Sequence, residues 1–214
     1  LTAEKVAQQW KVTREAQDAF ALESHRRAIA AQQAGEFADE IASIEVVTKF
    51  PDLATRELAA STRTVALDEG PRADTSLEAL GRLRPAFASP KDPGGKATGL
   101  GSVTAGNSSQ TSDGAGALIV ASEAAVKRFG LTPLARFVSF SVRGVPPQIM
   151  GIGPKEAIPA ALARAGIGQD ALDWIELNEA FAAQALAVIG DLGLDPAKVN
   201  PMGGAIALGH PLGA

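Results

Sequence analysis

The spacing of apolar positions predicts that the chain begins with helices. Helical periodicity covers residues 2–10 and then an alanine-rich stretch between Thr13 and Gly35. Thr13 suits a helix N-cap because its hydroxyl can accept a hydrogen bond from a free backbone N–H. Gly35 suits the helix end because glycine tolerates a left-handed backbone. We therefore expect one short and one long helix at the N-terminus.

The rest of the chain is predicted to mix strands, helices and turns. Residues 48–75 carry prolines and mixed charges without a firm period, so we expect a loop there; residues 92–116 are rich in small polar residues that favour tight turns. The predicted strands are 41–47, 115–121, 134–142, 173–177 and 198–200. The predicted helices are 76–83, 122–129, a segment from the turn at 151–154 to about 165, and 179–192. This alternation after residue 115 predicts a layered α/β structure.

Composition narrows the class of protein. Of the 214 residues, 46% are hydrophobic and 21% are charged, which is the balance of a globular protein rather than a disordered one. The net charge is -4 and the Lys and Arg residues are scattered, so we expect no nucleic-acid partner. No apolar run is long enough to predict a membrane span. The sequence has no cysteine, which excludes disulfides, cysteine-bound zinc and a thiolate nucleophile within these residues.

Both ends of the sequence suggest a piece of a longer chain. It begins without methionine at Leu1, already inside a helical pattern, and it ends at 209–214 within a turn. We therefore expect that the parent protein extends beyond both ends.

The strongest candidate for chemistry is His210, in the segment from Asn200 to Gly213. Gly209 allows a sharp turn before the histidine and Pro211 restricts it to an extended backbone, so a rigid loop presents the imidazole. Such an imidazole suits a general base, which must reach a reacting atom within hydrogen-bond distance. The residues alone leave a second interpretation open, a loop histidine whose ring nitrogens bond to backbone groups.

Asn178 is a second candidate because it follows the predicted strand 173–177. Ligands of α/β sheets gather at the carboxyl ends of strands, and an asparagine there can donate a hydrogen bond to a substrate oxygen or hold a water that does so. The alternative is a helix N-cap without chemistry, which asparagine fills well. Glu179 would then lie in the first helical turn, where the helix dipole favours a carboxylate, and needs no catalytic role.

Residues 104–110 form a third candidate site, because their small side chains would let a polar ligand approach the backbone. The alternative is a turn-rich connector. The nearby glycines fit neither a P-loop nor a dinucleotide fingerprint. His25 is expected on a solvated helix face. Two distant histidines give no metal site, and no Gly-x-Ser-x-Gly elbow supports a serine hydrolase.

Together these segments resemble the thiolase family over nearly all 214 residues. The resemblance rests on three motifs in the family's order: 105–109 with Asp113-Gly114, then Asn178-Glu179-Ala180-Phe181, then 203–211. It implies an incomplete, layered αβαβα fold of the α/β class with a mostly helical loop domain. The expected divisions are a CoA-binding loop domain at 1–111, the last strand and helix of the N-terminal core domain at 112–132, and the first part of the C-terminal core domain at 133–214.

The resemblance also implies a reaction. Thiolases cleave 3-ketoacyl-CoA with CoA to acetyl-CoA and a shortened acyl-CoA, using a cysteine nucleophile. His210 matches the family histidine that activates the cysteine and helps to bind the thioester oxygen, and Asn178 matches the asparagine that holds a water there. Ser109 and Arg72 match residues at the pantetheine arm and the nucleotide end of CoA. Ala180 and Phe181 match residues that line the pantetheine channel.

This chain departs from the family pattern because it contains no cysteine. Both family cysteines are expected outside residues 1–214, so we predict that this chain alone is inactive. The amino-acid sequences of residues 108–113 and 174–177 are most similar to those of degradative 3-ketoacyl-CoA thiolases of fatty-acid β-oxidation. The alternatives are a biosynthetic acetoacetyl-CoA thiolase and a non-catalytic relative that binds CoA or lipid.

Partners and location are carried over from the family only as expectations. They are acyl-CoA and CoA as substrates with no cofactor and no metal, a homodimer or homotetramer, and membership of a β-oxidation multienzyme complex. The protein would be cytoplasmic in a bacterium, and mitochondrial or peroxisomal in a eukaryote.

Overall fold

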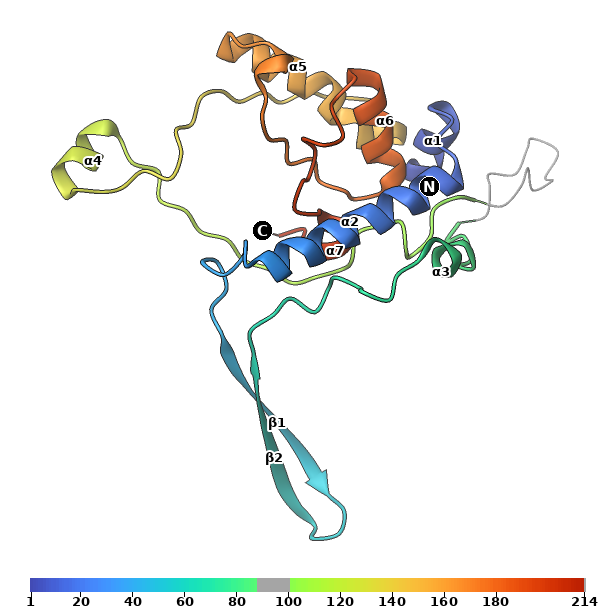
Figure 1. The fold of residues 1–214 in the computed structure, drawn as a ribbon, viewed down its shortest axis with the longest axis vertical. Coiled ribbons are helices and arrows are strands. Elements are labelled where there is room, and N and C mark those ends of the chain that lie inside the picture. Colours follow the sequence, from blue (N-terminus) through green and yellow to red (C-terminus); the bar gives the residue numbers. More distant parts are fainter. Residues whose placement is uncertain (88–100, 214) are drawn as a thin grey trace.

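The computed structural model describes residues 1–87 and 101–213. Figure 1 shows a body of helices from which a long hairpin projects on one side and a small helix on two extended arms on another. The α-helices are α1 (Thr2–Gln9), α2 (Arg14–Ala34), α3 (Leu77–Gly81), α4 (Glu123–Phe129), α5 (Gly153–Ala165), α6 (Ala182–Leu192) and α7 (Ala205–Leu208). The 3-10 helices are η1 (Pro147–Ile152) and η2 (Gln169–Ala171), and the strands are β1 (Ile44–Asp52) and β2 (Glu57–Val65).

Helix α2 lies at the centre of the body, with α6 and α7 packed against it (Figure 1). It starts and ends as the sequence predicts: the Thr13 hydroxyl accepts a hydrogen bond from the backbone N–H of Ala16 at 3.2 Å, and Gly35 adopts a left-handed backbone with φ 77°. Its buried alanines include Ala21 and Ala28. Small side chains on this face let neighbouring segments approach the helix closely.

Three groups of apolar side chains form the core. One packs α6 against the segments before and after it and contains Leu177, Val188 and Val199. A second joins α2, α3, α6 and α7 and includes Ile206, which is almost fully buried. The third joins α1, η1 and α6. The core therefore packs beside the loop before α6, which carries Asn178, and beside α7, which directly precedes the loop that carries His210.

The prediction of a loop at 48–75 is wrong in its first part, because the hairpin β1–β2 occupies 44–65. The strand predicted at 41–47 begins and ends later, at Ile44 and Asp52. Ile44 pairs with Val65 and Asp52 with Glu57 in an antiparallel register. Most side chains on both faces are exposed. Because neither face is buried, selection for alternating apolar residues is weak, and the alternation that predicts a strand at 41–47 does not continue through the rest of the hairpin.

The strands predicted at 115–121 and 134–142 are wrong for the chain as described. Both segments are extended but have no strand partner among the described residues, and their apolar side chains are exposed, with Ile119 at 90%. A run of apolar residues becomes a strand only when a neighbouring strand accepts its hydrogen bonds. Of the predicted turn region 92–116, residues 92–100 lie outside the described residues.

The strands predicted at 173–177 and 198–200 meet in a single parallel bridge between Ile175 and Val199. The Ile175 N–H donates to Lys198 O, and the Asn200 N–H donates to Ile175 O, both at 2.9 Å. Helices predicted at 76–83, 122–129 and up to about 165 are confirmed by α3, α4 and α5. The helix predicted to begin at Glu179 begins at Ala182 instead.

Candidate active site

The structure brings the side chains of Asn178 and His210 together. The Asn178 Nδ2 atom lies 3.2 Å from Nε2 and 3.5 Å from Nδ1 of the His210 ring, so the amide can donate to an unprotonated ring nitrogen. His210 is half-buried and Asn178 is exposed. Phe181 occupies the N-cap position of α6, so the alternative of Asn178 as a helix cap is wrong.

The backbone of His210 is held by the segment 110–112. Its N–H donates to Gln110 O at 3.1 Å and to the Ser112 hydroxyl at 3.0 Å, and Thr111 and His210 form a parallel bridge. Gly209 has φ 109°, and an added Cβ there would collide with the Ser112 side chain. Among the described residues the imidazole nitrogens approach the Asn178 amide and no backbone group, contrary to the alternative of a backbone-bonded loop histidine.

Gln110 also fixes the short helix that precedes His210. Its side-chain Nε2 lies 2.9 Å from Ala207 O, 3.1 Å from Ile206 O and 2.9 Å from Gly70 O. The side chain therefore ties the end of α7 to the segment around Gly70, while the backbone carbonyl of Gln110 accepts the His210 N–H. Gln110 was predicted only as the last residue of the candidate segment 104–110, without this role, and Ser112 was not predicted as a site residue.

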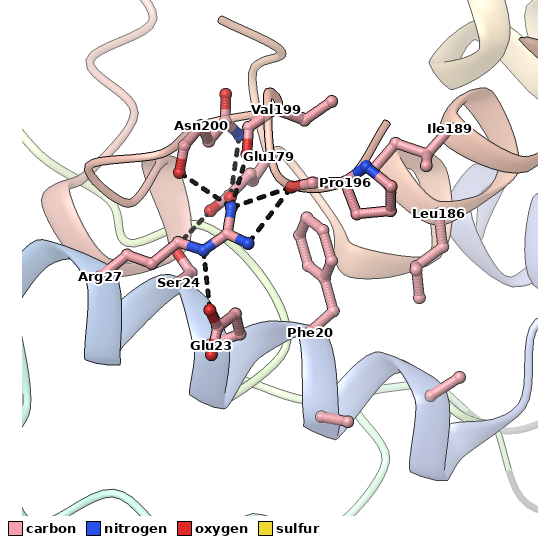
Figure 2. A pocket seen from close by; sticks show the side chains of 12 residues that line it. Phe20, Glu23, Ser24, Arg27, Glu179, Leu186, Ile189, Pro196, Val199 and Asn200 are labelled. Carbon is pink, nitrogen blue, oxygen red and sulfur yellow. Dashed lines mark hydrogen bonds and ion pairs between the residues drawn. The ribbon is translucent and has the colours of Figure 1, made fainter. Parts of the chain in front are cut away.

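Glu179, the residue after Asn178, lies in a buried polar network with Ser24 and Asn200 (Figure 2). Its carboxylate accepts hydrogen bonds from Ser24 Oγ at 2.6 Å, Asn200 Nδ2 at 2.9 Å and the Ile206 N–H at 3.1 Å. Burial raises the pKa of Glu179, and these hydrogen bonds oppose the rise. The expectation that Glu179 lies in the first turn of a helix is wrong, because this carboxylate connects three segments before α6 begins.

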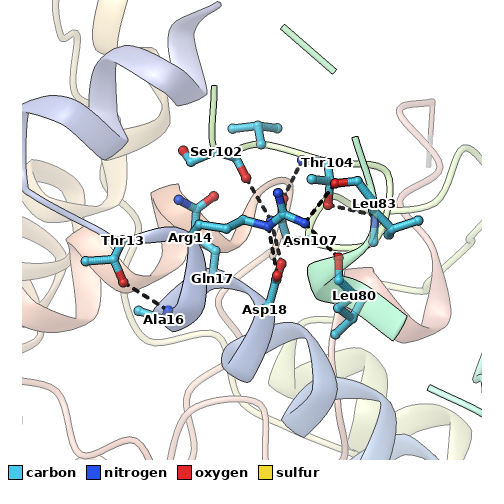
Figure 3. A network of polar contacts seen from close by, with 12 residues as sticks. Thr13, Arg14, Ala16, Gln17, Asp18, Leu80, Leu83, Ser102, Thr104 and Asn107 are labelled. Carbon is cyan, nitrogen blue, oxygen red and sulfur yellow. Dashed lines mark hydrogen bonds and ion pairs between the residues drawn. The ribbon is translucent and has the colours of Figure 1, made fainter. Parts of the chain in front are cut away.

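A second network shapes the turn 104–109 (Figure 3). Asn107 donates from Nδ2 to Asp18 Oδ1 at 2.9 Å and accepts at Oδ1 from the Thr104 N–H at 2.8 Å. Arg14 pairs with the other oxygen of Asp18 at 2.7 Å. The predicted small-residue turn is therefore anchored to α2 through buried Asn107, a member of the predicted motif 105–109 for which the sequence predicted no individual role.

This turn places Ser109 beside Ala180 and Phe181. The Ser109 N–H donates to Ala180 O at 3.0 Å, the Ala182 N–H donates to Asn107 O at 2.9 Å, and Ser108 forms an antiparallel bridge with Phe181. Three of the four predicted CoA-contacting residues thus meet next to Asn178.

Arg72 lies beside His25, on the side of α2 that borders a cavity of about 320 Å³ lined by both residues. The Arg72 N–H donates to His25 Nδ1 at 3.1 Å. His25 is buried, so its predicted place on a solvated face is wrong. Burial, with the nearby Arg72 charge as a second cause, lowers the pKa of His25. Gly70, bonded to Gln110, lies two residues before Arg72 and connects this region to the His210 loop.

A second cavity, of about 260 Å³, lies between α2 and α6 and is lined by Phe20, Glu179 and Asn200, among others (Figure 2). Neither of these two cavities is lined by Asn178 or His210. Over residues 1–87 and 101–213, no group of three or more His, Cys, Asp or Glu side chains is arranged to hold a metal ion. No helix in these ranges is both long and apolar enough to cross a membrane.

Comparisons with known proteins agree with these motifs. The family model for the thiolase N-terminal domain matches residues 1–124, and the model for the thiolase C-terminal domain matches residues 131–214. A 3-ketoacyl-CoA thiolase of Bacillus subtilis is 49% identical over 213 residues, which cover 99% of this chain and 51% of that protein. An acetyl-CoA acetyltransferase of Pseudomonas aeruginosa is 50% identical over 214 residues, which cover 100% of this chain and 50% of that protein.

Solved structures show the same similarity. Human mitochondrial 3-ketoacyl-CoA thiolase matches with a TM-score of 0.84 at 48% identity, covering 99% of this chain and 48% of that chain. The dimeric peroxisomal thiolase of Saccharomyces cerevisiae matches with a TM-score of 0.81 at 42% identity, covering 100% and 48%. The chain spans about half the length of the relatives it matches. The predicted thiolase-like α/β fold is confirmed by these matches, and the chain belongs to the thiolase family.

Proposed function

We propose that the natural protein containing this chain is an acyltransferase that cleaves 3-ketoacyl-CoA with CoA, giving acetyl-CoA and a shortened acyl-CoA. The observation that carries the proposal is the 3.2 Å approach of Asn178 Nδ2 to the His210 ring, beside the turn that holds Ser109. Two donor side chains on rigid loops suit a reaction in which negative charge develops on a thioester oxygen.

In this mechanism His210 has two roles. Its imidazole takes the proton of the attacking thiol and, once protonated, donates a hydrogen bond to the thioester oxygen. A water held by the Asn178 amide donates the second hydrogen bond to the same oxygen. When the carbon–carbon bond breaks, the shortened acyl group stays on the attacking sulfur until it passes to CoA, and acetyl-CoA leaves as an enolate whose charge these two donors stabilise. The second family cysteine, also expected outside residues 1–214, then gives the enolate its proton. The thiol nucleophile is a cysteine expected outside residues 1–214, since these contain none.

CoA is proposed as a substrate and not as a resident cofactor. Ser109, Ala180 and Phe181 would contact its pantetheine arm, and their mutual hydrogen bonding supports a shared channel wall. Arg72 would contact the nucleotide end, because a planar guanidinium can stack on adenine and pair with phosphate.

The proposed role is that of a degradative thiolase in fatty-acid β-oxidation, supported by the amino-acid sequences of residues 108–113 and 174–177. The second candidate is a biosynthetic acetoacetyl-CoA thiolase, which the 50% identity to an acetyl-CoA acetyltransferase favours. Rates on 3-ketoacyl-CoA of increasing chain length separate them: long chains are favoured only in the degradative case. A non-catalytic CoA-binding relative would bind CoA without any turnover.

A homodimer is the proposed assembly, supported by the similarity to a dimeric thiolase, and membership of a multienzyme β-oxidation complex is an extension of the same proposal. The relatives include bacterial and peroxisomal proteins, so the location follows from the organism.

The test is thiolysis of acetoacetyl-CoA and longer 3-ketoacyl-CoA by the natural protein and by its His210→Ala and Asn178→Ala variants. We expect losses of kcat of about 10²–10³-fold or more with folded protein, as for removal of an oxyanion donor. The 214-residue chain alone is expected to be inactive. Full activity of either variant, or thiolysis by the 214-residue chain alone, would contradict the proposal.

A further inference from the structure

Glu179 has the position of a link between the two proposed catalytic side chains. It follows Asn178 directly in the chain and is only 2% exposed. Its Oε2 atom accepts the N–H of Ile206, in the helix α7 that ends two residues before His210. Glu179 therefore belongs to the segment that carries the amide, and its carboxylate is hydrogen-bonded to the helix that precedes the imidazole.

Two further contacts fix this carboxylate to the rest of the body (Figure 2). Ser24 on α2 donates to Glu179 Oε2 at 2.6 Å and accepts the N–H of Gly204 at 3.1 Å. Asn200 donates to Glu179 Oε1 at 2.9 Å, while its own amide group is paired with both backbone groups of Leu177 at 2.8 and 2.7 Å. The start of α7 is thus held by Ser24 and Glu179 together.

The network requires a carboxylate rather than any polar side chain. Three donors point at the two oxygens of Glu179, and a carboxylate is the side chain that only accepts. A glutamine that turned its oxygen toward Ser24 and Ile206 would set its NH2 group against the Asn200 NH2 group. Asn200 cannot turn to relieve this, because Leu177 engages both ends of its amide.

We infer that Glu179 is a positioning residue that sets the separation of the Asn178 amide and the His210 imidazole in the proposed thiolase reaction. It touches no reacting atom. It acts by fixing the backbone of 177–179 against the start of α7. Only the expected effect on kcat rests on the proposed function.

The test compares Glu179→Gln with Glu4→Gln in the natural protein. Glu4 is a matched control because it is also 2% exposed and also accepts three hydrogen bonds, from the Ser102 N–H, the Val103 N–H and the Ser102 hydroxyl. It belongs to α1 and makes no contact with the His210 loop through these bonds. Hydrogen–deuterium exchange of residues 203–213 and steady-state kinetics with CoA-binding stoichiometry are measured for both variants.

In Glu179→Gln we expect exchange in 203–213 to quicken at least about tenfold, since a held segment becomes locally open. We expect kcat per CoA-binding site to fall by about 10–100-fold while KM changes little, because misplacement by about 1 Å has this effect on rate. In Glu4→Gln both quantities stay near those of the unmodified protein. If Glu179→Gln does not fold, Ser24→Ala takes its place with smaller changes of the same kind.

Unchanged exchange in 203–213, or a fall in activity that only follows the fraction of protein able to bind CoA, would overturn the inference. If the unmodified protein shows no thiolysis, the proposed function fails by itself, and the exchange comparison still decides whether Glu179 holds the His210 loop.

Discussion

Replacing Gly204 by alanine tests the close packing behind His210. A Cβ at this position would lie 2.3 Å from Cδ and 2.5 and 2.6 Å from the two oxygens of the Glu179 carboxylate, whereas ordinary contact begins near 3.4 Å. The carboxylate or the backbone must move by about 1.1 Å, the difference between 3.4 and 2.3 Å. The φ angle of Gly204 is -140°, so the backbone itself tolerates alanine and the effect is purely steric.

Two costs contribute to the expected destabilisation. Overpacking of a filled interior costs about 1–3 kcal/mol. A displaced Glu179 loses hydrogen bonds to a charged group, each contributing about 1.5–3 kcal/mol. We expect Gly204→Ala to lower the free energy of unfolding by about 3–5 kcal/mol, a large share of the stability of a typical domain.

Urea denaturation of the natural protein, followed by tryptophan fluorescence, measures this change. Gly190→Ala is the matched control: Gly190 lies in α6, a Cβ there meets nothing within 4 Å, and alanine should stabilise the helix by up to about 1 kcal/mol. In the double variant Gly204→Ala/Glu179→Ala the second change should cost much less than alone. Equal midpoints for Gly204→Ala and Gly190→Ala would refute the steric reasoning.

Three further predictions follow from the site. Folding lowers the pKa of His25, so the unfolded state binds more protons than the folded state near pH 6. The contribution of neutral His25 to the free energy of unfolding is therefore complete above the unfolded pKa of about 6.5 and is lost as the pH falls below that value. We expect His25→Gln to flatten this loss of stability at acid pH, measured by urea titrations. An unchanged loss of stability at acid pH would contradict this. Arg72→Ala should weaken CoA binding about tenfold by calorimetry, whereas Arg82→Ala, in an exposed ion pair, should not; equal affinities would remove Arg72 from the CoA site. Gln110→Ala should lower stability by about 1–3 kcal/mol by thermal denaturation, since buried carbonyls lose their donor; an unchanged melting temperature would show that the side chain holds nothing.

Elements whose determinants are local could be predicted from the sequence. The limits of α2 follow from Thr13 and Gly35, whose side chain and backbone freedom act within one turn. The rigid presentation of His210 follows similarly from Gly209. The meeting of His210 with Asn178 was expected only from the family resemblance, since no spacing rule relates two residues on separate loops.

Elements that depend on a distant partner could not be predicted. The hairpin β1–β2 is exposed on both faces and so lacks apolar alternation beyond Val47, while the segment 115–121 has the composition of a strand without a neighbour among the described residues. The burial of His25 and Glu179 depends on Arg72, Ser24 and Asn200, far away in the chain. From the sequence alone, a polar side chain next to apolar ones is predicted to be exposed to solvent, because the hydrogen-bond partners that would allow its burial are not known.

A crystal structure of the natural protein with bound acetyl-CoA tests the shared role of the two loops most directly. We predict the thioester oxygen within about 3 Å of the His210 ring nitrogen and of a water bonded to the Asn178 amide. A thioester oxygen bound to other groups, with the imidazole and the amide both out of hydrogen-bond reach, would contradict the proposed chemistry.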